Sequence, residues 1–148
     1  MEITADIRWS GATNAEQSYC RTHEWRFDGG AVVAASAAPW IVPPPISDPT
    51  LVDPEEALVA AVSSCHMLFY LSLASSEGIV VESYADTPVG VMARNAAGEM
   101  SITSITLAPQ VRFADLAPDP ETDCALHDLA HARCFIANSI RADVRVKL

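Results

Sequence analysis

A stretch of almost uninterrupted apolar residues, from Ala57 to Ala74, constrains the fold of this chain more than any other feature. It follows Asp53-Pro54-Glu55-Glu56, in which an acidic cap, a proline at the first helical position and a glutamate three residues after the cap mark a helix start. Gly78 supplies a stop signal, so we predict a helix over residues 54–77. A helix that is apolar on nearly every side is expected to be buried all round.

The same stretch approaches the length of a membrane-crossing helix, which needs about 20 apolar residues. His66 lies in the middle of it, acidic residues flank it, and no lysine or arginine lies nearby, and all of these features disfavour insertion into a membrane. We therefore predict a core helix and no membrane partner. The 148 residues, 50% of them apolar, suit one domain over residues 1–148 with a sizeable core.

Alternation of apolar and polar residues predicts strands on both sides of this helix. The expected strands are residues 3–9, 19–27, 31–38, 80–92, 100–113 and 140–148. Prolines between Pro39 and Pro49 predict a stiff, extended loop or arm, and Asp119-Pro120 opens a second helix that ends near Cys134 or Phe135. Three strands, a long helix, two strands, a helix and a strand predict an α+β fold on a mainly antiparallel sheet.

Charge and motif content exclude several classes of function. Nine basic residues against 19 acidic ones give a net charge of −10, and the basic residues are scattered, so no nucleic acid partner is expected. The chain has no GxGxxG, GKS, GKT or GxSxG motif, which removes support for nucleotide binding and serine hydrolysis. Its first residues lack a secretory signal pattern, so we expect a cytoplasmic, reducing location where cysteines are thiols, redox groups or metal ligands.

Cys65 is the first candidate for chemistry. Ser63-Ser64-Cys65-His66 places four polar or reactive groups in the middle of an otherwise apolar helix, and polar groups in such a place need partners. Cys134, at the end of the second helix, is another candidate. Taken alone, each thiol is a small packing residue, so the two matter chemically only if they meet.

Metal binding is a competing interpretation. Four potential ligands fall at spacings of three, four and three along the second helix, roughly on one stripe: Cys124, His127, His131 and Cys134. The outer two lie about 15 Å apart along a helix, so only the two histidines, or His131 with Cys134, could share an ion. Either pair would need further ligands, such as Cys65 or His66. Partly exposed histidines on an amphipathic helix are the simpler interpretation, and a non-catalytic binding module with an apolar pocket is a third.

Two segments carry a resemblance to a known family. Residues 52–65, Val-Asp-Pro-Glu-Glu-Ala-Leu-Val-Ala-Ala-Val-Ser-Ser-Cys, resemble the Pro-Glu-(Glu/Gln)-Leu-hydrophobic-Ala-Ala-x-x-(Ser/Ala)-Cys helix of the OsmC and organic hydroperoxide resistance (Ohr) family. Residues 130–139 resemble that family's second-cysteine segment, and the element order agrees along nearly the whole chain. The resemblance implies an OsmC-like fold, an intertwined homodimer and a thiol-dependent peroxidase acting on organic hydroperoxides. We expect no cofactor and no metal.

The resemblance also implies roles for four residues. The family's reactive cysteine falls on Cys65, its second cysteine on Cys134 and its helix-start glutamate on Glu55. The family uses an arginine near the reactive sulfur. Arg21 shares one face of the expected second strand with aromatic residues that should point inward, so it is preferred to Arg26 on the other face.

The expected chemistry follows from these residue types. A guanidinium beside Cys65 stabilises a thiolate and orients a peroxide oxygen. Attack on the O–O bond leaves a sulfenic acid and releases an alcohol, and Cys134 then condenses with the sulfenic acid to a disulfide. In the family, small lipoyl-type dithiols reduce the pair again. Two residues depart from the family pattern: Phe135 stands where members often have proline, and His66 follows the reactive cysteine.

Overall fold

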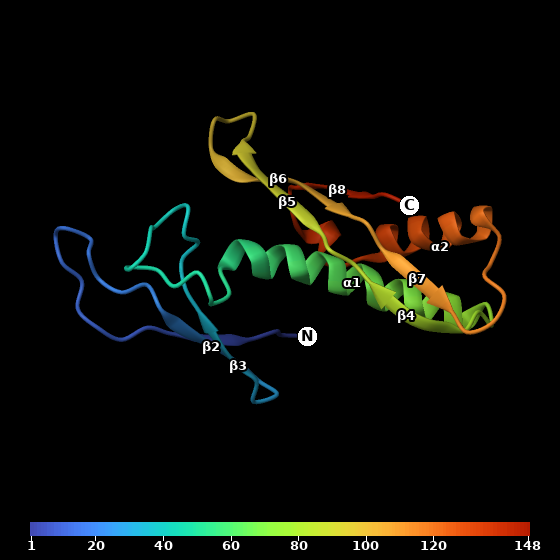
Figure 1. The fold of residues 1–148 in the computed structure, drawn as a ribbon, viewed down its shortest axis with the longest axis horizontal. Coiled ribbons are helices and arrows are strands. Elements are labelled where there is room, and N and C mark those ends of the chain that lie inside the picture. The colour runs from blue at the N-terminus through green and yellow to red at the C-terminus, as the bar shows by residue number, and fades with distance from the viewer. The chain divides into compact units, whose positions relative to one another are not determined.

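The computed structural model describes all 148 residues, which form two compact units, residues 1–57 and residues 58–148. In the N-terminal unit, strands β1 (Ala5–Arg8), β2 (His23–Phe27) and β3 (Val32–Ala35) form an antiparallel sheet in the order β1-β2-β3 (Figure 1). All three strands are shorter than expected. The second begins at His23 and not at residue 19, because the backbone N–H of Arg21 donates to the carbonyl of Ile46 (2.9 Å) in the proline-rich segment.

The proline-rich segment is a folded loop of successive turns, not an extended arm. The Ser47 hydroxyl donates to the Val42 carbonyl (2.5 Å), and the Asp48 N–H donates to the Ser36 hydroxyl (3.0 Å). Ser36 and Ser47 are both buried by this arrangement. Polar side chains within and next to the proline run thus supply the hydrogen bonds that fold the loop, which the proline content alone did not indicate.

Helix α1 (Pro54–Ser76) begins and ends almost where the sequence predicts. The capping box is present, because the Glu56 N–H donates to Asp53 Oδ1 (2.8 Å) and the Asp53 N–H donates to Glu56 Oε2 (3.3 Å). Gly78 follows its end with a φ of 74°, in the left-handed region that glycine adopts at little cost.

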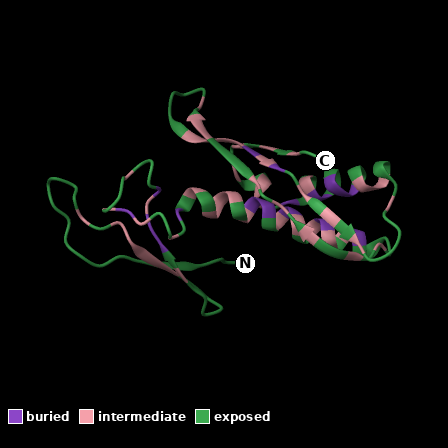
Figure 2. Ribbon diagram, viewed as in Figure 1, coloured by how far each residue is buried: buried purple, intermediate pink, exposed green.

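Burial of α1 differs from the expectation. Its buried residues lie along one stripe, and the rest of the helix is half-buried or exposed (Figure 2). Leu68, for example, is 61% exposed. The single chain supplies packing partners for one side of the helix only, so the prediction of burial all round is wrong for one chain. By length and composition alone, with a mean hydropathy of 1.7, α1 meets the criteria for a membrane-crossing helix, as the core helices of globular proteins also do.

Two small sheets belong to the C-terminal unit. Strand β4 (Val81–Ala85) pairs with β7 (Gln110–Phe113), and β6 (Met100–Leu107) lies between β5 (Val89–Arg94) and β8 (Asp143–Val146). The strand pairs are antiparallel except for β6 with β8, which is parallel and not predicted. The α+β class with mainly antiparallel pairing is confirmed.

The two long strands predicted over residues 80–92 and 100–113 are each divided in two. The breaks lie at residues 86–88 and 108–109, and each contains a proline, which has no N–H for a ladder. The Ala108 N–H donates to Asp86 Oδ1 (2.8 Å), so one break is tied to the other. The carboxylate replaces the ladder hydrogen bond that the strand loses there.

The end of the chain holds helix α2 (Pro120–Arg133) and a 3-10 turn, η1 (Ala137–Ser139), that the sequence did not predict. Asp119 caps α2 by accepting from the N–H groups of Glu121 and Thr122, as its sequence signal indicates. Two buried clusters form the core of this unit: Tyr70, Ala74, Leu126 and Ala130, and Val62, Ile105 and Leu107. The first cluster packs α1 against α2.

Candidate functional site

Helices α1 and α2 meet through polar pairs as well as through apolar packing. The Tyr70 hydroxyl donates to Asp123 Oδ1 (2.5 Å), and His66 Nε2 lies 3.0 Å from His127 Nδ1. Because higher residue numbers on α1 pair with lower numbers on α2, the two helices are antiparallel. The preceding turn of α1, which contains Val62 and leads to Cys65, lies against Cys134 at the end of α2.

The two candidate cysteines lie together. Cys134 is fully buried, and its thiol is 3.9 Å from the carbonyl of Val62, one turn before Cys65. Burial and a hydrogen bond with the neighbouring Cys65 thiol raise the pKa of Cys134 to about 11. Cys65 is half-buried, and both thiols are free.

The local sequence explains why Cys134 lies there. Cys134 ends α2, and its N–H donates to the carbonyl of His131 (3.2 Å). The chain then turns into η1, from which the Ala137 N–H donates to the Cys134 sulfur (3.4 Å). The turn that follows the helix therefore holds the sulfur in place against α1.

The histidine pair is buried, with each residue 1% exposed. The planes of the two rings lie at 4° to one another. The distance of 3.0 Å between the two ring nitrogens is that of a hydrogen bond, in which one nitrogen donates and the other accepts. Burial, then the neighbouring His127 and His131, lowers the pKa of His66 to about 4, and burial also lowers that of His127 against the opposing effect of Asp123. The expectation of partly exposed histidines on α2 is wrong for His127, because its α1 partner could not be read from the spacing on α2.

The polar residues that flank Cys65 have partners as expected. Ser63 donates to Asp86 Oδ2 (2.5 Å), and His66 pairs with His127. Sequence reasoning missed Asp86, Tyr70 and Asp123 as members of this network. Tyr70 follows His66 by four residues and Asp123 precedes His127 by four, so the i, i+4 spacing was a usable signal.

An apolar groove of about 520 Å³ opens beside Cys65. Its lining consists of Ala61, Ser64, Cys65, Leu68, Phe69, Ser72, Phe135 and Ile136. The rings of Phe69 and Phe135 meet edge to face, with centroids 5.1 Å apart and planes at 86°. A cavity of this size, largely apolar and with a sulfur in its wall, suits a small organic molecule.

The predicted stripe of metal ligands on α2 does not share one environment. Cys124 is exposed, whereas His127 and Cys134 are buried on the side that faces α1. Over the whole chain, no group of three or more histidine, cysteine, aspartate or glutamate side chains is arranged to hold a metal ion.

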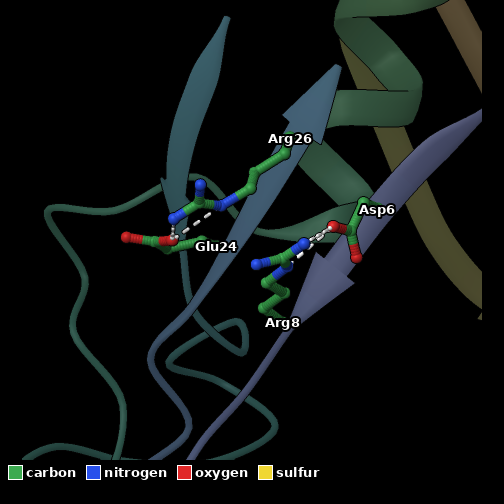
Figure 3. Close-up of polar contacts among 4 residues, drawn as sticks. All are labelled: Asp6, Arg8, Glu24 and Arg26. Carbon is green, nitrogen blue, oxygen red and sulfur yellow. Dashed lines mark hydrogen bonds and ion pairs between the residues drawn. The ribbon is translucent and has the colours of Figure 1, made fainter. Parts of the chain in front are cut away.

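The predicted arginine lies in the N-terminal unit, as does its alternative. The Arg21 guanidinium lies 3.4 Å from the Tyr19 ring centroid and donates to the carbonyls of Tyr19 and Gln17, without an ion pair. Arg26 forms an ion pair with Glu24 at 2.7 Å, and Arg8 forms one with Asp6 on the neighbouring strand β1 (Figure 3). Of these two candidates, Arg21 is therefore the one whose guanidinium forms no ion pair with a carboxylate.

Glu55 lies in the first turn of α1, at the end of the N-terminal unit. Its Oε2 atom is buried and has no hydrogen-bond partner. An unsatisfied buried carboxylate oxygen costs about 1–3 kcal/mol or more, so it is an acceptor in need of a donor.

Known proteins resemble this chain in sequence and in fold. The model of the OsmC-like protein family matches residues 47–148. An OsmC-like protein of unknown function from Vibrio cholerae O1 biovar eltor is 42% identical, with a TM-score of 0.93, over 99% of this chain and 98% of that one. Two further structures share the fold. An organic hydroperoxide resistance protein from Elizabethkingia anophelis is 17% identical over 100% and 94% of the two chains, with a TM-score of 0.73. The organic hydroperoxide resistance protein OhrB of Bacillus subtilis is 20% identical over 98% and 97%, with a TM-score of 0.66. A search of curated proteins found no match.

Proposed function

The chain belongs to the OsmC family, and on that premise we propose that it is a thiol-dependent peroxidase that reduces organic hydroperoxides. The observation that carries the proposal is the meeting of Cys65 and Cys134 beside an apolar groove. The names of the hydroperoxide resistance proteins that share the fold agree with this chemistry.

In the proposed reaction, Cys65 is the peroxidatic residue. Its thiolate attacks one oxygen of the hydroperoxide, the O–O bond breaks, and the alkoxide takes a proton and leaves as an alcohol. Cys65 is then a sulfenic acid. Cys134 attacks its sulfur, the S–O bond breaks, a disulfide forms and water leaves with the thiol proton.

The closeness of the two sulfurs serves the second step. A sulfenic acid without a nearby thiol climbs to sulfinic acid under excess peroxide. Cys134, buried against α1, is available at once and is kept from competing oxidants by its burial and protonation.

Arg21 and Glu55 are proposed to act at the Cys65 sulfur. A guanidinium stabilises the thiolate and polarises the peroxide, and Arg21 has no carboxylate partner in the N-terminal unit. Glu55 has a buried carboxylate oxygen without a donor, which a guanidinium would satisfy. Glu55 thus lacks a hydrogen-bond donor, and the Arg21 guanidinium lacks a carboxylate partner.

A small dithiol of the lipoyl type is the proposed reductant, because membership of the OsmC and Ohr family implies such a reductant. The proposal further includes a homodimer of one OsmC-like domain per chain in a reducing, cytoplasmic setting, which suits the four free cysteines.

Mass spectrometry after one equivalent of cumene hydroperoxide tests the proposal. The expected product is a disulfide between Cys65 and Cys134, with a mass lower than that of the reduced chain by two hydrogen atoms. Recovery of both thiols unmodified, or a disulfide that involves Cys20 or Cys124, would contradict it.

Variants separate the roles of the thiols. Cys65→Ser should abolish peroxide consumption, whereas Cys20→Ser and Cys124→Ser, which change exposed thiols, should leave it nearly intact. Cys134→Ser should allow a first turnover and then accumulate sulfinic acid on Cys65. Full activity of the Cys65→Ser variant would contradict the assignment of Cys65 as the peroxidatic residue.

A further inference from the structure

The backbone of Arg21 is held by partners outside any strand pair. Arg21 lies two residues before β2, and its N–H donates to the Ile46 carbonyl (2.9 Å). Its own carbonyl oxygen lies 2.9 Å from Nδ1 of the His23 ring. A half-buried backbone group needs a hydrogen-bond partner, and here a side chain supplies the partner that a strand ladder does not.

The two hydrogen bonds of the His23 ring assign its tautomer. A carbonyl oxygen only accepts, so Nδ1 carries the hydrogen and donates it to Arg21. The indole nitrogen of Trp25 only donates, and it lies 2.9 Å from His23 Nε2, so Nε2 carries the lone pair. Trp25 therefore fixes the tautomer of His23 that can hold the Arg21 carbonyl.

This arrangement lies on one face of β2. Side chains alternate along a strand, so His23 and Trp25 share a face. Glu24 and Arg26 lie on the other face, where they form an ion pair (Figure 3). The charged pair is thus separated from the neutral side chains that hold Arg21.

The guanidinium of Arg21 is also held by neutral groups. It donates to the carbonyls of Tyr19 (3.1 Å) and Gln17 (3.2 Å), and its central carbon lies 3.4 Å from the centroid of the Tyr19 ring. None of these partners carries a negative charge. They fix the place of the guanidinium and leave its charge available to an anion.

We propose that His23 is a positioning residue for the reaction: its Nδ1–H, fixed by Trp25, holds the backbone that presents the Arg21 guanidinium to the Cys65 sulfur. The inference rests on the proposed function, in which Arg21 acts at that sulfur. His23 touches neither the sulfur nor the substrate in this role. Without its hydrogen bond the Arg21 peptide is free to rotate, and a misplacement of about 1 Å can lower a rate by up to about a hundredfold.

Two amide variants separate positioning from packing. The amide nitrogen of asparagine is bonded to Cγ, as Nδ1 is in histidine, whereas that of glutamine lies one bond further out, near the place of Nε2. His23→Asn should therefore keep kcat/KM for cumene hydroperoxide within about threefold of the wild type, and His23→Gln and His23→Leu should each lower it at least about tenfold. Glu24→Gln, on the other face of β2, is the control and should leave kcat/KM unchanged.

A double-mutant cycle tests whether His23 acts through the arginine. Arg21→Ala removes the guanidinium but keeps the carbonyl that His23 holds. In this background, His23→Leu should lower the remaining kcat/KM by less than about twofold, because the group that it positions is gone.

A thiol assay without peroxide separates this inference from the peroxidase proposal. In Cys20→Ser/Cys124→Ser protein at pH 7, iodoacetamide should alkylate Cys65 at a rate set by its thiolate, because Cys134 is buried and protonated. Alkylation should be fast in the wild-type and His23→Asn forms of this protein and slow in the His23→Gln and His23→Leu forms. This order, without peroxide consumption by the wild type, would uphold the positioning of Arg21 by His23 and overturn the peroxidase.

Three results would overturn the role of His23 itself. The first is equal activity and equal alkylation in the wild type, His23→Leu and His23→Gln. The second is a faster reaction in His23→Gln than in His23→Asn. The third is an undiminished effect of His23→Leu in the Arg21→Ala background, which would make His23 a structural residue only.

Discussion

At the scale of single residues, Gly90 marks the closest approach of β5 to α1. A Cβ atom there would lie 2.5 Å from Val59 Cγ2, and the side chain of valine has little rotamer freedom on a helix. Gly90→Ala should therefore lower the free energy of unfolding by about 1–3 kcal/mol, measured by urea denaturation. Gly29→Ala is the matched control, because no atom lies within 4 Å of its Cβ position. Equal stability of the two variants would contradict the close approach.

The protonation of Cys134 gives a second prediction at this scale. Its pKa of about 11, raised mainly by burial, leaves it a thiol at neutral pH, and only the thiolate attacks. The rate of disulfide closure should therefore rise nearly tenfold for each pH unit from 7 towards 10. In Cys20→Ser/Cys124→Ser protein, an aromatic disulfide reagent can form a mixed disulfide with Cys65. Attack of Cys134 on this mixed disulfide releases the aromatic thiol that was bound to Cys65, and the rate of that release is the rate of closure. A rate that is independent of pH would contradict the raised pKa.

At the scale of elements, the paired histidines make the contact of α1 with α2 sensitive to acid. The unfolded chain binds protons at its histidines near pH 6.5, whereas His66 resists protonation to about pH 4 in the fold. Stability from this pair is complete above pH 6.5 and is lost as the pH falls towards 4, by about 2–3 kcal/mol. Urea unfolding at pH 7.5 and pH 4.5 measures the loss.

Variants of the pair isolate this effect from that of other titrating groups. His66→Leu alone should cost about 1–3 kcal/mol at pH 7.5, because it leaves His127 without its partner in the core. His66→Leu with His127→Leu should restore much of that loss and flatten the dependence on pH. An equally steep acid loss in the double variant would show that the pair is not its origin.

Elements whose signals are local were predictable from the sequence. The capping residues Asp53 and Asp119 fix the starts of both helices through neighbours within three residues, and both starts are confirmed. The division of the long strands and the parallel position of β8 depend on partners far along the chain, such as Asp86 with Ala108. The burial of His127 has the same origin, because its partner lies on another helix.

At the scale of the whole molecule, a single chain leaves many of its large apolar side chains exposed to solvent. Large apolar side chains are exposed in both units, among them Ile7, Val32, Trp40, Leu68 and Val80. Sequence reasoning predicted burial of α1 all round, and one chain covers one stripe of it. A second copy would supply the missing cover, so we expect a homodimer whose mass in solution is twice 15.8 kDa. Light scattering at micromolar concentration measures it, and a monomer there would contradict the expectation.

The last prediction is that each active site of this dimer combines residues of both chains. Glu55 and Cys65 lie on one helix, about 15 Å apart along its axis, so a carboxylate side chain cannot reach the sulfur region of its own chain directly. A partner can supply Glu55 without this constraint. Co-refolding Cys65→Ser protein with Glu55→Gln protein should then produce hybrids with one wild-type site, and random pairing should give about a quarter of wild-type activity. Each parent, refolded alone, is the control and should show far less. Hybrid dimers that form without any gain in activity would mean that Glu55 acts within its own chain or has no part in the reaction.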